Sequence, residues 1–400
     1  MAKYKMVPLG ENVEEMFIGP FGSSLKNENF VDFNEAYCMV YEQKHAIKKT
    51  MNLPTRYINK EKYDELKRFN IQGGDIIVSC RGTIGETYII PDDAPLGIMH
   101  PSIMKIRLKE GIYDKYYFNL LLNSRLNKHK VEANGSGIKM AISATELGKE
   151  LFPVPTMDEQ LKIADIIFKI SDIVKKRIKE LDTLDELVKA RFVEMFGSIS
   201  DGRFEMKTLP EIVNDDKKSI KRGPFGGALK KEDFVEDGYL VYEQRHAIHN
   251  DFNYAKYYIT KEKYESMIGF KVVPGDLIIS CSGTLGRIAE VPKSAKEGII
   301  NQALLKISLN QDIMLNTFFI QQFRGEEIQE ILFGFSRGSG IPNMPSMSEV
   351  KAVKFICPPI ELQNQFADFV YQIDKSKVAV QKALDEAQLL FDSLMQEYFG

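Results

Sequence analysis

The chain repeats itself after about 200 residues, and this repeat limits its possible folds more than any other feature. The stretch Gly19–Gly22, read GPFG, returns at Gly223–Gly226. The stretch YEQKHAI at Tyr41–Ile47 returns as YEQRHAI at Tyr242–Ile248, and Phe196-Gly197 returns as the final Phe399-Gly400. The offset drifts only from 201 to 204, as small loop insertions would produce. The chain is therefore two copies of one unit, each a globular part followed by a tail.

Both tails are predicted to be long helices. Residues 158–196 and 361–399 contain neither proline nor glycine, and their apolar residues step by four and three in the same register. A seven-residue repeat over about five heptads is typical of a coiled-coil seam, and each helix would be about 58 Å long. The alternative is two amphipathic helices, each packed on its own globular part. The predicted seam consists of Ile163, Ile167, Ile170, Leu181, Leu184 and Val188 with Phe366, Val370, Ile373, Leu384, Phe391 and Leu394.

The globular parts read as mixed α/β. Short apolar runs followed by Gly-Thr-x-Gly turns predict strands, and longer periodic runs predict one helix in each copy. The predicted strands are Ile76–Ser79, Thr87–Ile90, Ile103–Leu108, Leu277–Ser280, Arg287–Val291 and Leu304–Leu309, and the predicted helices are Tyr113–Leu126 and Met314–Gln329. The predicted domains are 1–152 and 198–355, each followed by a helical segment, 153–197 and 356–400.

Composition excludes several classes of protein. The formal charge of −3 rules out a chain held to nucleic acid by its overall charge, so any such surface must be local. The sequence shows no apolar run of membrane-spanning length, no signal peptide and no CxxC pair among its four cysteines, which favours a reduced, cytoplasmic protein. The sequence also has no phosphate-binding loop, no hydrolase or metalloprotease motif and no metal-ligand spacing. We therefore predict no catalytic residue, no metal site and a binding function.

Loops that combine glycine, small hydroxyls and cations point to phosphate and base contacts. His45 and His246 could be surface donors or could make local structural hydrogen bonds. Cys80 and Cys281 are expected in the core, and Asp75 and Asp276 in turns. The candidate DNA-binding residues are Ser23, Ser24, Lys26, Gln43, Lys44, His45, Lys48, Lys49, Arg81, Thr83 and Ser136 in the first copy, and Lys221, Arg222, Lys230, Gln244, Arg245, His246, Ser282, Thr284, Arg337 and Ser339 in the second.

The order of these parts resembles the specificity subunits of type I restriction–modification systems. The resemblance covers the whole chain and is carried best by Gly135-Ser136-Gly137-Ile138, Phe152-Pro153-Val154-Pro155 and the helix start Asp158-Glu159-Gln160. The second copy departs from this pattern, because Glu361-Leu362-Gln363 replaces Asp-Glu-Gln.

The resemblance implies an architecture and a set of partners. Two mixed α/β target-recognition domains would be joined by two long antiparallel coiled-coil helices in a pseudo-two-fold internal repeat. Each domain would read one half of a bipartite site in double-stranded DNA, and the helices would set the spacing. The chain would bind no cofactor itself. It would dock two methyltransferase subunits that use S-adenosylmethionine, joined by motor-nuclease subunits, with no membrane involved.

The likeness of the two copies adds a hypothesis, that the two half-sites are related in sequence. Two other classes of function stay open. One is a protein-only scaffold built on the coiled coil. The other is a methyltransferase or nuclease enzyme, against which the lack of a cofactor loop argues.

Overall fold

A computed structural model describes residues 4–136, 143–216, 218–225, 227–334 and 344–400. It divides into two compact units. Unit 1 consists of 1–177 and 383–400, and unit 2 consists of 178–382. The globular part of each unit is called its lobe below.

Lobe 1 is built on two four-stranded sheets, one antiparallel and one mixed. One has the strand order β2-β9-β6-β7 and the other β4-β3-β8-β5, while β1 pairs with β10. The strands are β1 (Lys5–Pro8), β2 (Val13–Ile18), β3 (Cys38–Tyr41), β4 (Tyr57–Ile58), β5 (Asn70–Ile71), β6 (Ile76–Ser79), β7 (Thr87–Ile89), β8 (Gly97–Met99), β9 (Ile103–Leu108) and β10 (Leu151–Val154). The helices are α1 (Leu9–Asn12), α2 (Gln43–Lys48), α3 (Lys60–Leu66), α4 (Lys115–Ser136) and α5 (Ala144–Lys149).

Lobe 2 repeats this plan. Its sheets have the orders β12-β20-β17-β18 and β13-β15-β14-β19-β16, and β11 pairs with β21. The strands are β11 (Met206–Thr208), β12 (Ile220–Arg222), β13 (Phe234–Val235), β14 (Tyr239–Tyr242), β15 (Tyr258–Ile259), β16 (Lys271–Val272), β17 (Leu277–Ser280), β18 (Ile288–Glu290), β19 (Gly298–Ile300), β20 (Leu304–Ile307) and β21 (Lys354–Ile356). The helices are α7 (Leu209–Ile212), α8 (Gln244–His249), α9 (Lys261–Ser266), α10 (Asn316–Arg324), α11 (Glu326–Phe333) and α12 (Met347–Ala352).

Strand β6 shows why these short apolar runs become central strands. All four of its residues are buried. Ile76 and Val78 belong to the cluster that includes Phe118 of α4, whereas Ile77 belongs to the cluster that includes Met39 of the second sheet. Because side chains alternate along a strand, an uninterrupted apolar run supplies both layers.

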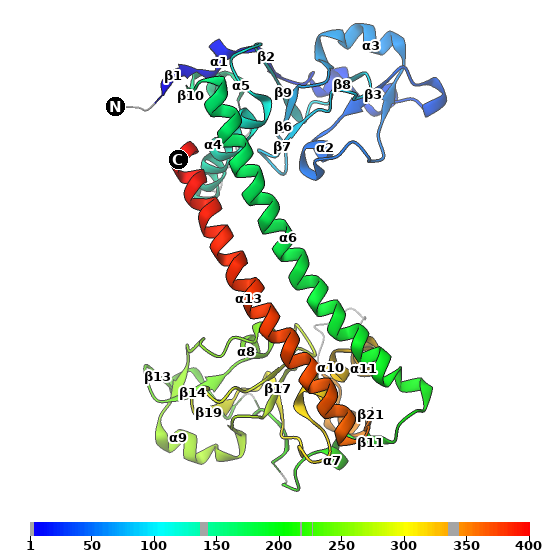
Figure 1. The fold of residues 1–400 in the computed structure, drawn as a ribbon, viewed down its shortest axis with the longest axis vertical. Helices are drawn as coiled ribbons and strands as arrows, with labels where there is room; N and C mark the ends of the chain where they lie inside the picture. The colour runs from blue at the N-terminus through cyan, green and yellow to red at the C-terminus, as the bar shows by residue number, and fades with distance from the viewer. Residues whose placement is uncertain (1–3, 137–142, 217, 226, 335–343) are drawn as a thin grey trace. The chain divides into compact units, whose positions relative to one another are not determined.

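Two 40-residue helices, α6 (Met157–Phe196) and α13 (Ile360–Phe399), begin four residues inside the predicted helical segments 153–197 and 356–400. In unit 1 the start of α6 packs against the end of α13, through Ile163 and Ile167 with Phe391 and Leu394. In unit 2 the end of α6 packs against the start of α13, and the Phe192 and Phe366 rings lie 5.5 Å apart. The helices are therefore antiparallel, as Figure 1 shows in green and in orange to red.

The burial of both helices follows the predicted stripe. All twelve predicted seam positions are buried or half-buried, with exposed residues between them. Helix α6 also contacts lobe 1, since Ile163 shares a cluster with Tyr117. The alternative in which each helix packs only on its own globular part is therefore wrong.

A buried glutamine fastens each helix to its lobe. Gln160 Nε2 donates to the carbonyl oxygens of Ile112 and Pro155, and its Oε1 accepts from the Asp114 N–H at 2.9 Å. Gln363 makes the equivalent contacts with Ile313, Pro358 and Leu315. The glutamine common to the two junction motifs is therefore a structural anchor.

The predicted elements match the structure closely, with two clear differences. The helix predicted over Tyr113–Leu126 is α4, which continues to Ser136, so Ser136 lies at the end of a helix and not in a loop. The stretch predicted as a single helix over Met314–Gln329 is two helices, α10 and α11, because Gly325 is extended between them. No helix in the described part of the chain combines the length and apolar character that a membrane span needs.

Candidate nucleic-acid interface

Three predicted loop segments of lobe 1 come together at one edge of its sheets. The Gly19 N–H donates to the Ile103 carbonyl at 3.0 Å, and a Cβ on Gly19 would collide with the His100 carbonyl oxygen. Gly82, with φ +67°, lies where an added Cβ would stand 3.9 Å from Gln43 Nε2. The Gly19 turn, the start of α2 and the Arg81–Thr83 loop therefore adjoin one another around His100.

Lobe 2 builds the same edge from the equivalent residues. The Gly223 N–H donates to the Leu304 carbonyl at 2.8 Å, and the Asn301 carbonyl oxygen leaves no room for a Cβ on Gly223. Gly283 takes the same left-handed backbone conformation as Gly82, with φ +66°. The repeated glycines are thus needed for close approach and for the turn, as predicted.

Charge at the edge of lobe 1 is organised by Glu42. Its carboxylate lies 2.7 Å from Lys44 Nζ and also pairs with the Arg56 guanidinium. Burial opposes ionisation of Glu42, but the hydrogen bonds from Lys44 and Arg56 hold the pKa of Glu42 below its usual range. The same cations and Arg81 add to burial in lowering the pKa of His100.

The equivalent edge of lobe 2 carries different side chains. Tyr257 stands where lobe 1 has Arg56, and its ring stacks on Phe234 with centroids 4.7 Å apart. Arg245 lies over the Tyr254 ring at 4.4 Å. Glu243 and Asn301 help to line a cavity of about 580 Å³. The two lobes thus share a backbone frame but differ in the charge they present.

Each lobe has an arginine near this edge, but the two arginines are at different repeat positions. In lobe 1 Arg81 lies two residues after the end of β6, and Ile18 ends β2. In lobe 2 Ser282 takes the place of Arg81, and Arg222 ends β12. Burial raises the pKa of the Cys80 and Cys281 thiols to about 12. The charge of Arg81 acts to lower the pKa of Cys80, and the charge of Arg222 acts to lower the pKa of Cys281. The described residues give neither arginine a hydrogen bond or an ion pair.

His45 and His246 require a correction. Both were candidate DNA contacts, but both are fully buried. Their Nδ1 atoms accept the N–H groups of Glu42 and Glu243 at 3.0 Å, and His246 Nε2 donates to the Tyr254 carbonyl at 2.9 Å. Burial lowers the pKa of His45. The histidines therefore hold the N-termini of α2 and α8 in place.

Gln43 and Gln244 show the same unusual feature in both lobes. Each side chain is half-buried, and each amide Oε1 is buried without a hydrogen-bond partner among the described residues. A buried acceptor without a donor costs about 1–3 kcal/mol. Its occurrence at both repeat positions favours a donor supplied by a ligand.

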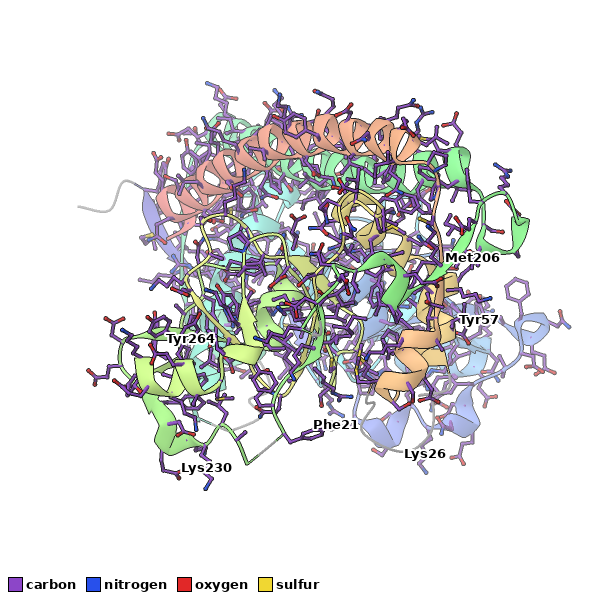
Figure 2. All side chains as sticks on the ribbon, turned by 90° about the horizontal axis from the view of Figure 1, so that it is seen from below. Phe21, Lys26, Tyr57, Met206, Lys230 and Tyr264 are labelled. Atoms are coloured by element: carbon purple, nitrogen blue, oxygen red, sulfur yellow. The ribbon has the colours of Figure 1, made fainter. Side chains whose placement is uncertain are left out.

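The other candidates divide by exposure. Ser24, Lys44, Lys221, Arg222 and Ser282 are half-buried, and Lys221 Nζ lies 4.9 Å from the Phe270 ring centroid. Arg337 and Ser339 lie outside the described residues, as does the side chain of Ser136. The exposed candidates are Ser23, Lys26, Lys48, Lys49, Arg81, Thr83, Lys230, Arg245 and Thr284. Figure 2 shows Lys26 and Lys230 each at the side of its unit away from α6 and α13.

The remaining residues singled out in the sequence are structural. Cys80 and Cys281 are buried in the core, as predicted. Asp75 and Asp276 accept the N–H groups of Gln72 and Val273 in equivalent turns, both at 2.9 Å. Within the described ranges no three His, Cys, Asp or Glu side chains are placed to hold a metal ion.

Sequence reasoning missed two features of this edge. Arg56 has no arginine at its repeat position, so the repeat gave no signal for it. Phe21 and Phe225 of the repeated GPFG motif are not among the predicted contacts, yet both side chains are almost fully exposed. Their position in a repeated motif was the available signal.

Comparison with known proteins gives one family. The model of the type I restriction modification DNA specificity domain matches residues 17–183 and again 220–387. Two specificity subunits of type I restriction enzymes from Methanocaldococcus jannaschii, MjaX and MjaIX, are each 21% identical. The alignments cover 82% of this chain and 79% of MjaX, and 80% of this chain and 76% of MjaIX.

Solved structures share the fold over the full chain. One comes from work on complex assembly and conformational transition of the type I R-M system. It has a TM-score of 0.60 at 14% identity, covering 100% of this chain and 98% of that one. The type I restriction-modification system S subunit from M. genitalium has a TM-score of 0.55 at 16% identity, covering 100% and 97%.

Proposed function

Because this chain belongs to the family of type I restriction modification DNA specificity domains, we propose that its two lobes each read one half of a bipartite DNA site. The observation that carries the proposal is the doubled match. The edge formed in each lobe by the turn at Gly19 or Gly223, the start of α2 or α8 and the loop at Gly82 or Gly283 is called its reading edge below. Each match covers the reading edge of one lobe and most of the helix that follows it. The chain is the recognition subunit, and the chemistry belongs to its partners.

The reading edges support contact with DNA. Each carries a glutamine amide that can pair with adenine and an arginine that is free to meet guanine. Exposed lysines beside them, such as Lys26 and Lys230, suit phosphate contacts. With a net charge of −3 for the chain, its affinity for DNA alone is modest and depends strongly on salt.

The helices are proposed to act as the spacer between half-sites. Each of the 40-residue helices runs unbroken and contributes to both units. At 1.5 Å per residue a helix of this length spans about 60 Å, which exceeds one 34–36 Å turn of DNA. The gap between the half-sites is therefore fixed by the helices.

Matching apolar side chains on the helices support two equivalent docking sites for methyltransferase subunits. Phe168 and Leu390 are exposed in unit 1, and their repeat equivalents Tyr371 and Leu187 are exposed in unit 2. An exposed apolar position kept in both copies is typical of a protein contact. The methyltransferase subunits would bind and use S-adenosylmethionine, and motor-nuclease subunits would complete the restriction complex.

Mapping of N6-methyladenine tests the reading function. Cells that express the chain with its methyltransferase subunit should methylate a bipartite motif, and the triple variant Gln43→Ala/Lys44→Ala/Arg81→Ala should relax the first half only. A motif without two halves would contradict the proposal. Binding of S-adenosylmethionine by the chain alone would also contradict it and would favour the methyltransferase alternative.

Native mass spectrometry tests the docking sites. Phe168→Asp should remove one methyltransferase subunit from the complex, and Phe168→Asp/Tyr371→Asp should remove both. Val378→Asp is the matched control, because Val378 is also exposed but has Lys175 at its repeat position. Retention of two subunits by the double variant would rule out these sites.

A further inference from the structure

Phe21 and Phe225 are the most exposed of the large apolar side chains in the described residues, at 86% and 91%. They are repeat equivalents in the two GPFG turns. Figure 2 shows Phe21 at the side of unit 1 away from α6 and α13. One phenylalanine exposed by chance is ordinary, but the same one in both copies indicates a ligand.

Each turn is anchored on both sides of its phenylalanine. Pro20 and Leu25 are buried on either side of Phe21, as Pro224 and Leu229 are around Phe225. The Ser24 N–H donates to the Phe21 carbonyl at 2.8 Å, and the Ala228 N–H donates to the Phe225 carbonyl at 2.9 Å. Together with the close approach at Gly19 and Gly223, these contacts hold the residues on either side of each phenylalanine, which leaves its side chain projecting from the turn.

The surroundings of the turns are suited to a polyanion. Lys26 is exposed in the first, and Lys230 and Lys231 are exposed in the second. Arg222, which is half-buried at the end of β12, directly precedes the second turn. The root of the first turn adjoins His100 and hence the charges of Lys44, Arg56 and Arg81. The phenylalanines therefore stand beside the edges proposed to read DNA bases.

We propose that Phe21 and Phe225 are wedges that insert between neighbouring base pairs, one in each half-site. Apolar side chains at the tip of a DNA-binding surface partly unstack a base step and kink the duplex. Gly22 follows Phe21 directly, and a Cβ at Gly22 would have no heavy atom within 4 Å, so the backbone beside Phe21 is open to a ligand. This inference rests on the proposed function, and it adds that the DNA is deformed at two defined steps.

Fluorescence of 2-aminopurine tests the wedges. The full chain with its methyltransferase subunits is bound to duplexes of the mapped target, with 2-aminopurine placed at successive positions of each half-site. Unstacking should raise the fluorescence at least threefold at one step per half. Phe21→Ala should abolish the rise in the first half only, Phe225→Ala in the second only, and each should weaken binding about tenfold. Phe21→Leu should keep part of the rise, since leucine is also an apolar wedge.

Phe33→Ala is the matched control, because Phe33 is 73% exposed in the same lobe but lies outside the turn. It should leave both signals unchanged. Specific binding with no rise that depends on Phe21 or Phe225 would overturn the wedges alone. If Phe21→Ala bound the methyltransferase subunit more weakly but left the 2-aminopurine fluorescence unchanged, the wedge proposal would also be overturned. Phe21 would then be a protein contact. If the wild-type complex showed no sequence-specific binding to DNA, the proposed function would be overturned as well.

Discussion

Lys44 Nζ lies 2.7 Å from Glu42 Oε2, so the cation at the start of α2 is held by the residue just before the helix. The same carboxylate holds Arg56. In lobe 2 Glu243 stands in the same place, but Arg245 lies over the Tyr254 ring and tyrosine replaces Arg56. Glu42 thus restrains two cations that could otherwise meet any phosphate.

Removing this restraint should make binding stronger and less selective. In Glu42→Gln both Lys44 and Arg56 are released, and each can displace one counterion from DNA. We expect the slope of log affinity against log salt to steepen by about 1–2, with poorer discrimination in the first half-site. Titrations at several salt concentrations measure this. Glu65→Gln, which frees only the distant Lys62, is the control, and an unchanged slope in Glu42→Gln would contradict the prediction.

The displaced arginine should make the two half-sites related but unequal. Gln43 and Gln244 occupy the same place in both lobes, whereas Arg81 and Arg222 do not. Arg81→Ser should reduce the discrimination against wrong bases at one base pair of the first half-site by about 1–3 kcal/mol. Recognition of the second half-site should not change. Ile18→Arg/Arg81→Ser, which copies the lobe 2 arrangement, should shift the first half-site towards the second.

Methylation mapping of these strains decides the matter. Half-sites that share no base pair would show that the likeness of the lobes is only structural. Arg222→Ile is the matched variant, and it should relax the second half-site alone.

Much of the fold could be predicted because the repeat and the periodicity act locally. Ile76–Ser79 had to be buried on both faces, and the stripe through Ile163 and Phe366 had to be covered. The break at Gly325 was missed because one glycine in a periodic run does not reveal where the backbone becomes extended.

The site was harder to predict, because the type of a residue does not tell whether its side chain faces solvent. His45 and Lys44 are neighbours in one motif, yet one is in the core and the other at the surface. Arg56 reaches Glu42 from a separate loop through tertiary packing, which no local pattern encodes. The exposure of Phe21 likewise depends on where Pro20 and Leu25 are anchored.

Lys49 ends α2 in a left-handed conformation, with φ +50°, and Asn250 ends α8 in the same way. Asparagine adopts this conformation at lower cost than lysine. Lys49→Asn should therefore stabilise the protein by roughly 1 kcal/mol in urea denaturation, while removing one candidate phosphate contact. Asn250→Lys should have the opposite effect on stability. A destabilised Lys49→Asn protein would show that the lysine side chain has a structural role.

Acid should weaken lobe 1 through the buried His45 and the half-buried His100. Burial lowers the pKa of both His45 and His100. The positive charge of Arg56 lowers the pKa of His100 further. In the unfolded chain both rings take up a proton near pH 6.5, whereas the folded lobe resists protonation to a lower pH. The unfolded state then binds more protons, so stability is complete above about pH 7 and falls as the pH decreases through about 6.5. Urea denaturation at pH 7.5 and at pH 5.5 measures the loss. His45→Gln, which cannot titrate, should be less stable at pH 7.5 but should lose less on acidification, and an equal loss in both proteins would exclude His45 as the source.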